Sequence, residues 1–263
     1  MVRLVIYLML SIFTGAASFF IENSTVVNMT AGFAVGMLIP VVEEIGKNWK
    51  QIRHIWYSLR YRNRSIRVST AYLFRILIDG KYLLIRGSRY SNQFQPVGGV
   101  HKVSLQGSTA LASMGVTGDD LIPVDAESDG DIRVRVPGRR LVEFFNWFNS
   151  RDGREDSPWR EFQEELIAGG VLPSSVFPHI MHNYIRREVD RIRYSPYADS
   201  LEILVADIYE LVPNRDQEDA LRQLALNGHP DIQWVTAQQI RRRGATPGQP
   251  QSVEIADHSR RLL

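Results

Sequence analysis

The stretch Arg160-Glu161-Phe162-Gln163-Glu164-Glu165-Leu166 decides the fold of this chain. In a helix, Glu161, Glu164 and Glu165 stand at positions i, i+3 and i+4, so their carboxylates project from one side. Three like charges at this spacing repel one another unless a cation lies among them. Hard divalent ions such as Mg²⁺ prefer oxygen ligands and suit phosphate chemistry. The stretch therefore predicts a magnesium site, with a solvated acidic helix face as the alternative.

The segment before this helix predicts a β-hairpin and a glycine turn. Val68–Leu77 is rich in β-branched and aromatic residues, and Lys81–Arg86 reads as the returning strand. Asp79-Gly80 between them is typical of a tight turn. The glycine pair of Pro96-Val97-Gly98-Gly99-Val100 then allows the backbone to approach a ligand closely.

These motifs together resemble the Nudix family over about residues 68–263. Downstream, Leu201–Leu211 predicts a long strand, and Ile232–Thr236 predicts a strand that leads into a helix near Ala237. Ile255–Leu262 resembles that family's closing helix. The resemblance implies an α/β domain in which a mixed sheet is sandwiched by helices.

The family's signature, the Nudix box, is expected to be split in this chain. In the family one continuous stretch runs from a glycine through a glutamate to the Arg-Glu pair. Counted from Gly99, the glutamate position is Leu105, and Arg160 comes about 47 residues later than the pattern requires. We therefore predict an insertion over residues 101–158, with a strand at Asp131–Val136 and a helix at Arg139–Asn149. We assign no catalytic residue.

The N-terminal part of the chain predicts two membrane-spanning helices. Residues 4–21 contain eighteen positions without a charge, and residues 26–42 contain seventeen more. Each is close to the length that crosses a hydrocarbon core. Only residues 22–25 separate them, so they are predicted to form a helical hairpin within residues 1–42. A cleaved signal peptide and the buried helices of a soluble core are the alternatives.

The charges around these segments predict their orientation. Seven Lys or Arg residues lie between Lys47 and Arg67, and none lies in the loop between the spans. The positive-inside rule then places both termini in the cytoplasm. Residues 43–67 are interpreted as a basic amphipathic juxtamembrane linker that contacts lipid headgroups or pairs with a copy of itself. Gly32 and Gly36 form a small-xxx-small pattern that suits close helix packing, although glycine is also simply common in membrane helices.

Candidate ligand-binding residues lie between the predicted hairpin and the glycine pair. An aromatic side chain here could stack on a base while an arginine holds a phosphate. The residues concerned are Arg86, Arg89, Tyr90, Phe94, Gly98 and Gly99. The net charge of +2 is small for a protein that binds nucleic acid polymers, and the absence of cysteine excludes disulfides and thiolate metal sites.

Two spans, a basic helix and a split box resemble the membrane-anchored Nudix effectors of bacterial CBASS antiphage systems, which carry a SMODS-associated Nudix domain. The resemblance implies a multi-pass protein of the inner membrane. It also implies a functional partner, a cGAS/DncV-like nucleotidyltransferase, which makes a cyclic nucleotide such as cGAMP after infection. Binding of that ligand would drive homo-oligomerisation and disrupt the membrane. The alternatives are a membrane-anchored, Mg-dependent Nudix hydrolase of nucleoside diphosphate derivatives and a membrane scaffold that binds a protein.

Overall fold

The computed structural model describes residues 2–17, 20, 24–87, 92–119, 129–196, 198–245, 248 and 253–263. They form two compact units. The first comprises Met1–Arg64 and Gly138–Phe145, and the second comprises Ser65–Pro137 and Asn146–Leu263. The predicted insertion is therefore divided between the two units rather than folded as a module of its own.

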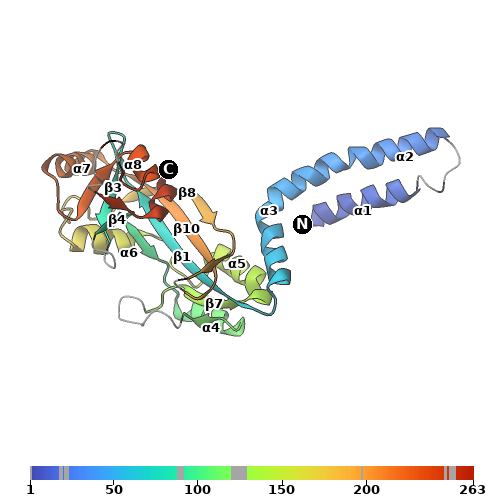
Figure 1. The fold of residues 1–263 in the computed structure, drawn as a ribbon, viewed down its shortest axis with the longest axis horizontal. Coiled ribbons are helices and arrows are strands. Elements are labelled where there is room, and N and C mark those ends of the chain that lie inside the picture. The colour runs from blue at the N-terminus through green and yellow to red at the C-terminus, as the bar shows by residue number, and fades with distance from the viewer. Residues whose placement is uncertain are drawn as a thin grey trace. The chain divides into compact units, whose positions relative to one another are not determined.

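Three helices make up most of the first unit: α1 (Val2–Ala17), α2 (Ser24–Gly36) and α3 (Leu38–Arg60). α1 lies alongside α2 (Figure 1), and the Ser11 hydroxyl donates to the carbonyl of Ala34 at 3.2 Å. α2 and α3 are separated only by a turn at Met37. Pro40 does not interrupt them, because it occupies the first turn of α3, where a proline is tolerated. The helix therefore continues past residue 42, and the division there into a span and a juxtamembrane linker stays a prediction.

One helix of this unit is long and apolar enough to cross a membrane. Thr25–Arg60 meets that criterion by length and composition, and only 6% of its most apolar window is buried. The apolar helix Arg3–Ala17 is shorter. Among the described residues one helix therefore passes this test, and the two-span hairpin of residues 4–21 and 26–42 stays a prediction.

The end of α3 is bound to part of the predicted insertion, namely the 3-10 helix η2 (Gly138–Arg140) and the start of α5 (Leu141–Ser150). The Ser58 hydroxyl donates to the carbonyl of Arg139 at 3.0 Å. The His54 ring stacks on Phe145 with 4.0 Å between centroids. These contacts attach a predicted linker to residues about 80 positions away along the chain.

The second unit is built on a seven-stranded mixed sheet (Figure 1). Its central strand β1 (Ser65–Arg75) pairs in parallel with β10 (Ser200–Val212) and antiparallel with both β7 (Arg133–Pro137) and β5 (Gly98–Val100). The outer strands are β8 (Met181–Val189) and β9 (Arg193–Ser195) on β10, and β6 (Thr117–Gly118) on β7. β10 agrees with the predicted long strand, and β7 and α5 agree with the strand and helix predicted inside the insertion.

A second sheet of five short strands contains β3 (Lys81–Arg86), flanked by β11 (Ile232–Val235) and β4 (Gln93–Gln95). β12 (Glu254–Ile255) pairs with β4, and β2 (Leu77–Ile78) pairs with β3. The predicted hairpin between Val68–Leu77 and Lys81–Arg86 is therefore wrong except at its tip. The turn itself is confirmed, since Asp79 and Gly80 have φ values of 48° and 75°.

Tertiary pairing explains that error. β1 contributes Tyr72 and Phe74 to one hydrophobic cluster and Leu73 to another, so both of its faces are buried. A strand buried on both faces gains most at the centre of a sheet, and β1 pairs there with the equally buried β10. The chain leaves β1 at Ile76, and β2 begins the second sheet.

Short helices complete the second unit. They are α4 (Leu105–Ser113), α6 (Trp159–Phe162), the π-helical turn η3 (Gln163–Ala168), α7 (Arg215–Asn227), α8 (Ala237–Arg241) and the 3-10 helix η4 (Asp257–Leu262). α8 begins at Ala237 as predicted, with Thr236 as its N-cap. The predicted closing helix at Ile255–Leu262 is instead the end of β12 followed by η4. Phe162 and Leu166 are buried in the same cluster as Tyr72 and Phe74, which holds the glutamate-bearing segment against the sheet.

Candidate functional site

The glycine strand and the glutamate helix lie together, although they are far apart in the sequence. The Gly98 N–H donates to a carboxylate oxygen of Glu165 at 2.9 Å, across 67 residues. A Cβ added to Gly99 would lie 2.0 Å from Oε1 of Glu161. Only glycine therefore fits at position 99 while Glu161 keeps its place. The two halves of the predicted split motif meet as one site in the tertiary structure.

Arg160 supplies the cation that the clustered glutamates require. Its Nη1 lies 2.7 Å from Glu161 and 3.0 Å from Glu164. Its Nη2 donates to the carbonyl of Val100 at 3.1 Å, which ties the helix to the glycine strand. The repulsion among the carboxylates is thus relieved by a guanidinium group from the same helix.

Glu155 is a site residue that sequence reasoning missed. It accepts hydrogen bonds from Arg160 Nε at 3.1 Å and from the Tyr72 hydroxyl at 3.1 Å. Sequence reasoning looked for a glutamate at Leu105, which lies at the start of α4 with 88% of its surface exposed. Glu155 stands shortly before Arg160 in the sequence, in the loop that precedes α6. Nothing in the sequence indicates that this loop folds back on the helix.

The helix carrying the glutamates is not regular. α6 is only four residues long, and the next six residues form a π-helical turn. A π turn accommodates an extra residue, so the simple i, i+3, i+4 geometry does not hold. Glu161 and Glu165 face the glycine strand, whereas the Glu164 side chain is 56% exposed. Glu164 nevertheless shares Arg160 Nη1 with Glu161, so these two carboxylates lie close together, as the prediction of a common face requires.

Burial changes the acidity of the two inner carboxyl groups. It raises the pKa of Glu161, and Arg160 only partly offsets this effect. It also raises the pKa of Glu165 to about 8, against the opposing effect of the Gly98 N–H and with the help of repulsion from Glu161. Part of the Glu165 surface stays accessible to solvent, so water screens some of this effect. Glu165 therefore keeps its proton to a higher pH than an exposed glutamate does.

The acidic groups of this site are already engaged within the chain, and the predicted magnesium site stays a prediction. Glu161 and Glu164 each bind Arg160 through one carboxylate oxygen, and Glu165 accepts a hydrogen bond from Gly98. Within the described part of the chain, no group of three His, Cys, Asp or Glu side chains is placed to hold a metal ion. We therefore derive no metal-dependent step from this site.

The raised pKa of Glu165 predicts a pH dependence of stability. Between the ordinary glutamate pKa of 4.5 and about 8, the folded state binds the Glu165 proton more tightly than the unfolded state does. Stability therefore falls as the pH rises through this window. The free energy of unfolding of the wild type should be lower at pH 9 than at pH 5, and Glu165 should account for on the order of a few kcal/mol of this difference, since one pKa unit corresponds to about 1.4 kcal/mol. Glu165→Gln, measured by urea unfolding at the same two pH values, should lack this contribution. Equal pH dependence in Glu165→Gln and the exposed control Glu164→Gln would contradict the assignment.

The other predicted ligand residues lie elsewhere. Arg86 and Phe94 are adjacent on β3 and β4, with the guanidinium 5.1 Å from the ring centroid. Arg86 also binds Asp231 at 3.0 Å, and Phe94 is only 8% exposed. The Phe94 ring is part of the core, and the stacking of an aromatic side chain of this segment on a base stays a prediction. Arg89 and Tyr90 lie outside the described residues.

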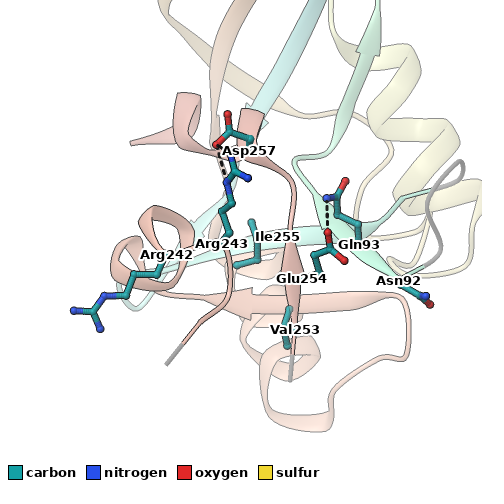
Figure 2. A pocket seen from close by; sticks show the side chains of 8 residues that line it. All are labelled: Asn92, Gln93, Arg242, Arg243, Val253, Glu254, Ile255 and Asp257. Atoms are coloured by element: carbon teal, nitrogen blue, oxygen red, sulfur yellow. Dashed lines mark hydrogen bonds and ion pairs between the residues drawn. The ribbon is translucent and has the colours of Figure 1, made fainter. Parts of the chain in front are cut away.

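A pocket of about 770 Å³ lies beside the second sheet, between β4, β12 and the residues around α8 and η4 (Figure 2). Its volume is in the range of small-molecule sites. Its polar side chains are largely paired with one another: Arg243 Nη2 lies 2.7 Å from Asp257, and Gln93 donates to Glu254 at 3.3 Å. Arg242 points away from the opening in Figure 2. The residues that line it are Asn92, Gln93, Arg242, Arg243, Val253, Glu254, Ile255 and Asp257.

The predicted membrane-packing glycines are open in the single chain. A Cβ added to Gly32 or Gly36 would meet no atom within 4 Å, whereas one added to Gly15 would lie 3.9 Å from Ala34 Cβ. Gly15, rather than Gly32 or Gly36, is thus the glycine at the contact between α1 and α2. The role of Gly32 and Gly36 in packing stays a prediction for an assembly of several chains.

A family model described as "SMODS-associated NUDIX domain" matches residues 65–263. The match begins at the first residue of β1 and includes the residues predicted as an insertion. No curated protein matches the chain.

Proposed function

Because the chain belongs to the SMODS-associated NUDIX domain family, we propose that it is an effector of a CBASS-type antiphage system. Its Nudix domain binds a cyclic nucleotide second messenger made by a cGAS/DncV-like nucleotidyltransferase, with cGAMP as the first candidate. Ligand binding drives homo-oligomerisation, and the clustered N-terminal helices disrupt the bacterial inner membrane.

The state of the glutamates supports sensing rather than cleavage. A phosphate-cleaving metal site must hold its cation through free carboxylates next to the scissile group. Here Arg160 binds the carboxylates of Glu155, Glu161 and Glu164, and burial raises the pKa of Glu165. The pairing of these glutamates with Arg160 is the observation that carries the proposal. In this arrangement the acidic groups join the glycine strand to the helix.

The N-terminal helices support the membrane part. Thr25–Arg60 is long and apolar enough to cross the bilayer. α1 lies against α2, as the two helices of a membrane hairpin would. The Lys and Arg residues after the apolar segment favour cytoplasmic termini. A ligand that binds the assembled state more tightly than the single chain shifts the equilibrium toward assembly by that difference in affinity. Assembly then raises the local concentration of the spans.

The ligand-binding step can be tested on the full chain in detergent. We expect cyclic GMP–AMP to bind tightly, to be recovered intact, and to increase the size of the particle measured by light scattering. Magnesium-dependent breakdown of nucleoside diphosphate derivatives, without binding of any cyclic nucleotide, would overturn the proposal in favour of a membrane-anchored hydrolase.

A glycine variant and a matched control test the membrane step. Leucines in the double variant Gly32→Leu/Gly36→Leu fill the open helix face, so we expect toxicity in ligand-producing cells to be lost while cyclic GMP–AMP binding is kept. Gly46→Leu is the control, because Gly46 lies in the same long helix and is equally open. A double variant as toxic as the wild type would show that these glycines do not mediate assembly.

A further inference from the structure

Three arginines gather where the loop after α5 meets β8 and β10. Arg187 of β8 stands opposite Asp207 of β10 and binds both of its carboxylate oxygens, at 2.6 and 2.7 Å. Arg154 and Arg187 both lie against the ring of Phe148, at 4.0 and 4.5 Å from its centroid. Arg151 completes the group, with its guanidinium 5.8 Å from the ring of Tyr184. We call Arg151, Arg154 and Arg187 the arginine cluster.

The arginine cluster carries more positive charge than the neighbouring carboxylates neutralise. Among the described residues, the ion pairs of these three arginines are confined to the one between Arg187 and Asp207. His101 also lies 3.4 Å from Asp207, but burial lowers its pKa, which disfavours a positive charge on its ring. Three guanidinium groups and one carboxylate leave a formal excess of two positive charges. Asp207 itself is held ionised, with a pKa of about 2, by hydrogen bonds from Arg187 and His101 that outweigh its burial.

The excess charge is costly because it is partly buried. Arg154 is 7% exposed, and its Nε and Nη1 donate to the carbonyls of Phe148 and Glu155 rather than to a carboxylate. Burial and the neighbouring Arg187 lower its pKa to about 10. Removing like charges from water without a counterion is unfavourable, so an anion that enters here would relieve the repulsion. Arginine is also the residue that matches phosphate geometry best.

An accessible side of the cluster is formed by Arg151 and Tyr184. Arg151 is exposed, and Tyr184 is 44% exposed. Arg151 is the first residue after α5 and has a φ of 63°, a conformation that usually selects glycine at a helix end. An arginine there costs about 1 kcal/mol of backbone strain relative to glycine. Its side chain forms no ion pair in the described part of the chain to offset that cost.

The pocket of Figure 2 lacks this property. Its arginine Arg243 is paired with Asp257, and Glu254 adds a second negative charge to its lining. The lining also contains Arg242, so two arginines balance two carboxylates. An incoming phosphate would find no excess positive charge there, whereas at the arginine cluster it would neutralise an existing excess.

We propose that the arginine cluster binds the phosphodiester groups of the nucleotide ligand, with Arg151 as the exposed contact and the Tyr184 ring as a surface on which a base stacks. This inference rests on the proposed function, since it places the ligand of that function at a site away from the glutamate helix. Arg154 and Arg187 then form the inner side of the site and are positioned by Phe148 and Asp207.

Full-length protein in detergent tests the inference with two probes, cyclic GMP–AMP and inorganic pyrophosphate. Arg151→Ala should weaken cyclic GMP–AMP binding at least about tenfold, and Arg151→Glu should abolish it, because one good charge-assisted contact is worth about 1.5–3 kcal/mol. Arg215→Ala, which removes another exposed arginine without an ion pair in the described structure, should bind as the wild type does. The melting temperatures of the ligand-free variants, which should equal that of the wild type, show that Arg151 acts on the ligand rather than on folding.

The possible outcomes distinguish failure of the arginine-cluster inference from failure of the proposed function. If the wild type and both Arg151 variants bind cyclic GMP–AMP equally, the ligand is received elsewhere and the cluster inference fails while the function stands. If the wild type binds no cyclic GMP–AMP, that ligand is excluded from the proposed function, and pyrophosphate decides the cluster. A rise in melting temperature with pyrophosphate in the wild type and not in Arg151→Glu supports the anion site. The same response in both proteins overturns it.

Discussion

Replacement of Arg67 by alanine is expected to lower the free energy of unfolding by about 3–5 kcal/mol. Arg67 lies on β1, and its side chain is 6% exposed. Its Nε binds Asp119 at 2.7 Å and its Nη1 binds Glu202 at 2.6 Å. Both carboxylates are buried. The variant removes the ion pair of Glu202 and leaves Asp119 with the longer contact to Arg135, at 3.7 Å.

The effect should appear as a lower urea midpoint with an unchanged slope, followed by tryptophan fluorescence. Arg222→Ala is a suitable control, because Arg222 pairs with Glu218, Asp219 and Asp79 but is 42% exposed. Exposed ion pairs contribute little, so this variant should lose less than about 1 kcal/mol. Equal losses in the two variants would show that burial of the Arg67 network does not determine its contribution.

Gly98→Ala should have the next largest effect, a loss of about 3 kcal/mol through backbone strain and overpacking. Gly98 has a φ of 145°, and a Cβ there would lie 2.1 Å from the carbonyl oxygen of Tyr72. That oxygen belongs to β1, the central strand, and cannot move aside as a flexible side chain would. The strand β5 must therefore shift, which also breaks the hydrogen bond from Gly98 to Glu165.

Gly80→Ala separates the two causes of that loss. Gly80 also has a positive φ, 75°, but no atom lies within 4 Å of an added Cβ. It should lose only the strain of the left-handed conformation, about 1 kcal/mol. Thermal unfolding of the two variants measures the difference, and equal losses would mean that the close approach of β5 to Tyr72 is not the limiting contact.

Local signals in the sequence predicted local structure well. The Asp79-Gly80 turn, the strand β10 and the start of α8 at Ala237 depend on residues within a few positions of one another. The partner of β1 does not. Val68–Leu77 and Lys81–Arg86 have the pattern of a hairpin, but β1 pairs with β10, which lies 135 residues later in register. Propensity says that a segment is extended and does not say which segment it pairs with.

The candidate site shows the same division. The three glutamates and the glycine pair were identifiable as residue types, and the need for a cation among the carboxylates followed from their charge. That Arg160 is this cation, and that Glu155 joins it, depends on the π turn and on the loop before α6. The arginine cluster was not predicted, because its members come from two segments about 35 residues apart. Only the tertiary structure brings them together around Phe148 and Tyr184.

The sequence by itself determined the family resemblance, the apolar N-terminal segment with its basic flank, and the turns and caps, because each depends on the order of neighbouring residues. Only the tertiary structure decided which charges meet. It joined Gly98 and Gly99 to Glu165 and Glu161, made Arg160 their counterion, and left the arginine cluster with uncompensated charge. Coulomb interactions depend on distance and burial in space, and neither quantity can be read from positions along the chain.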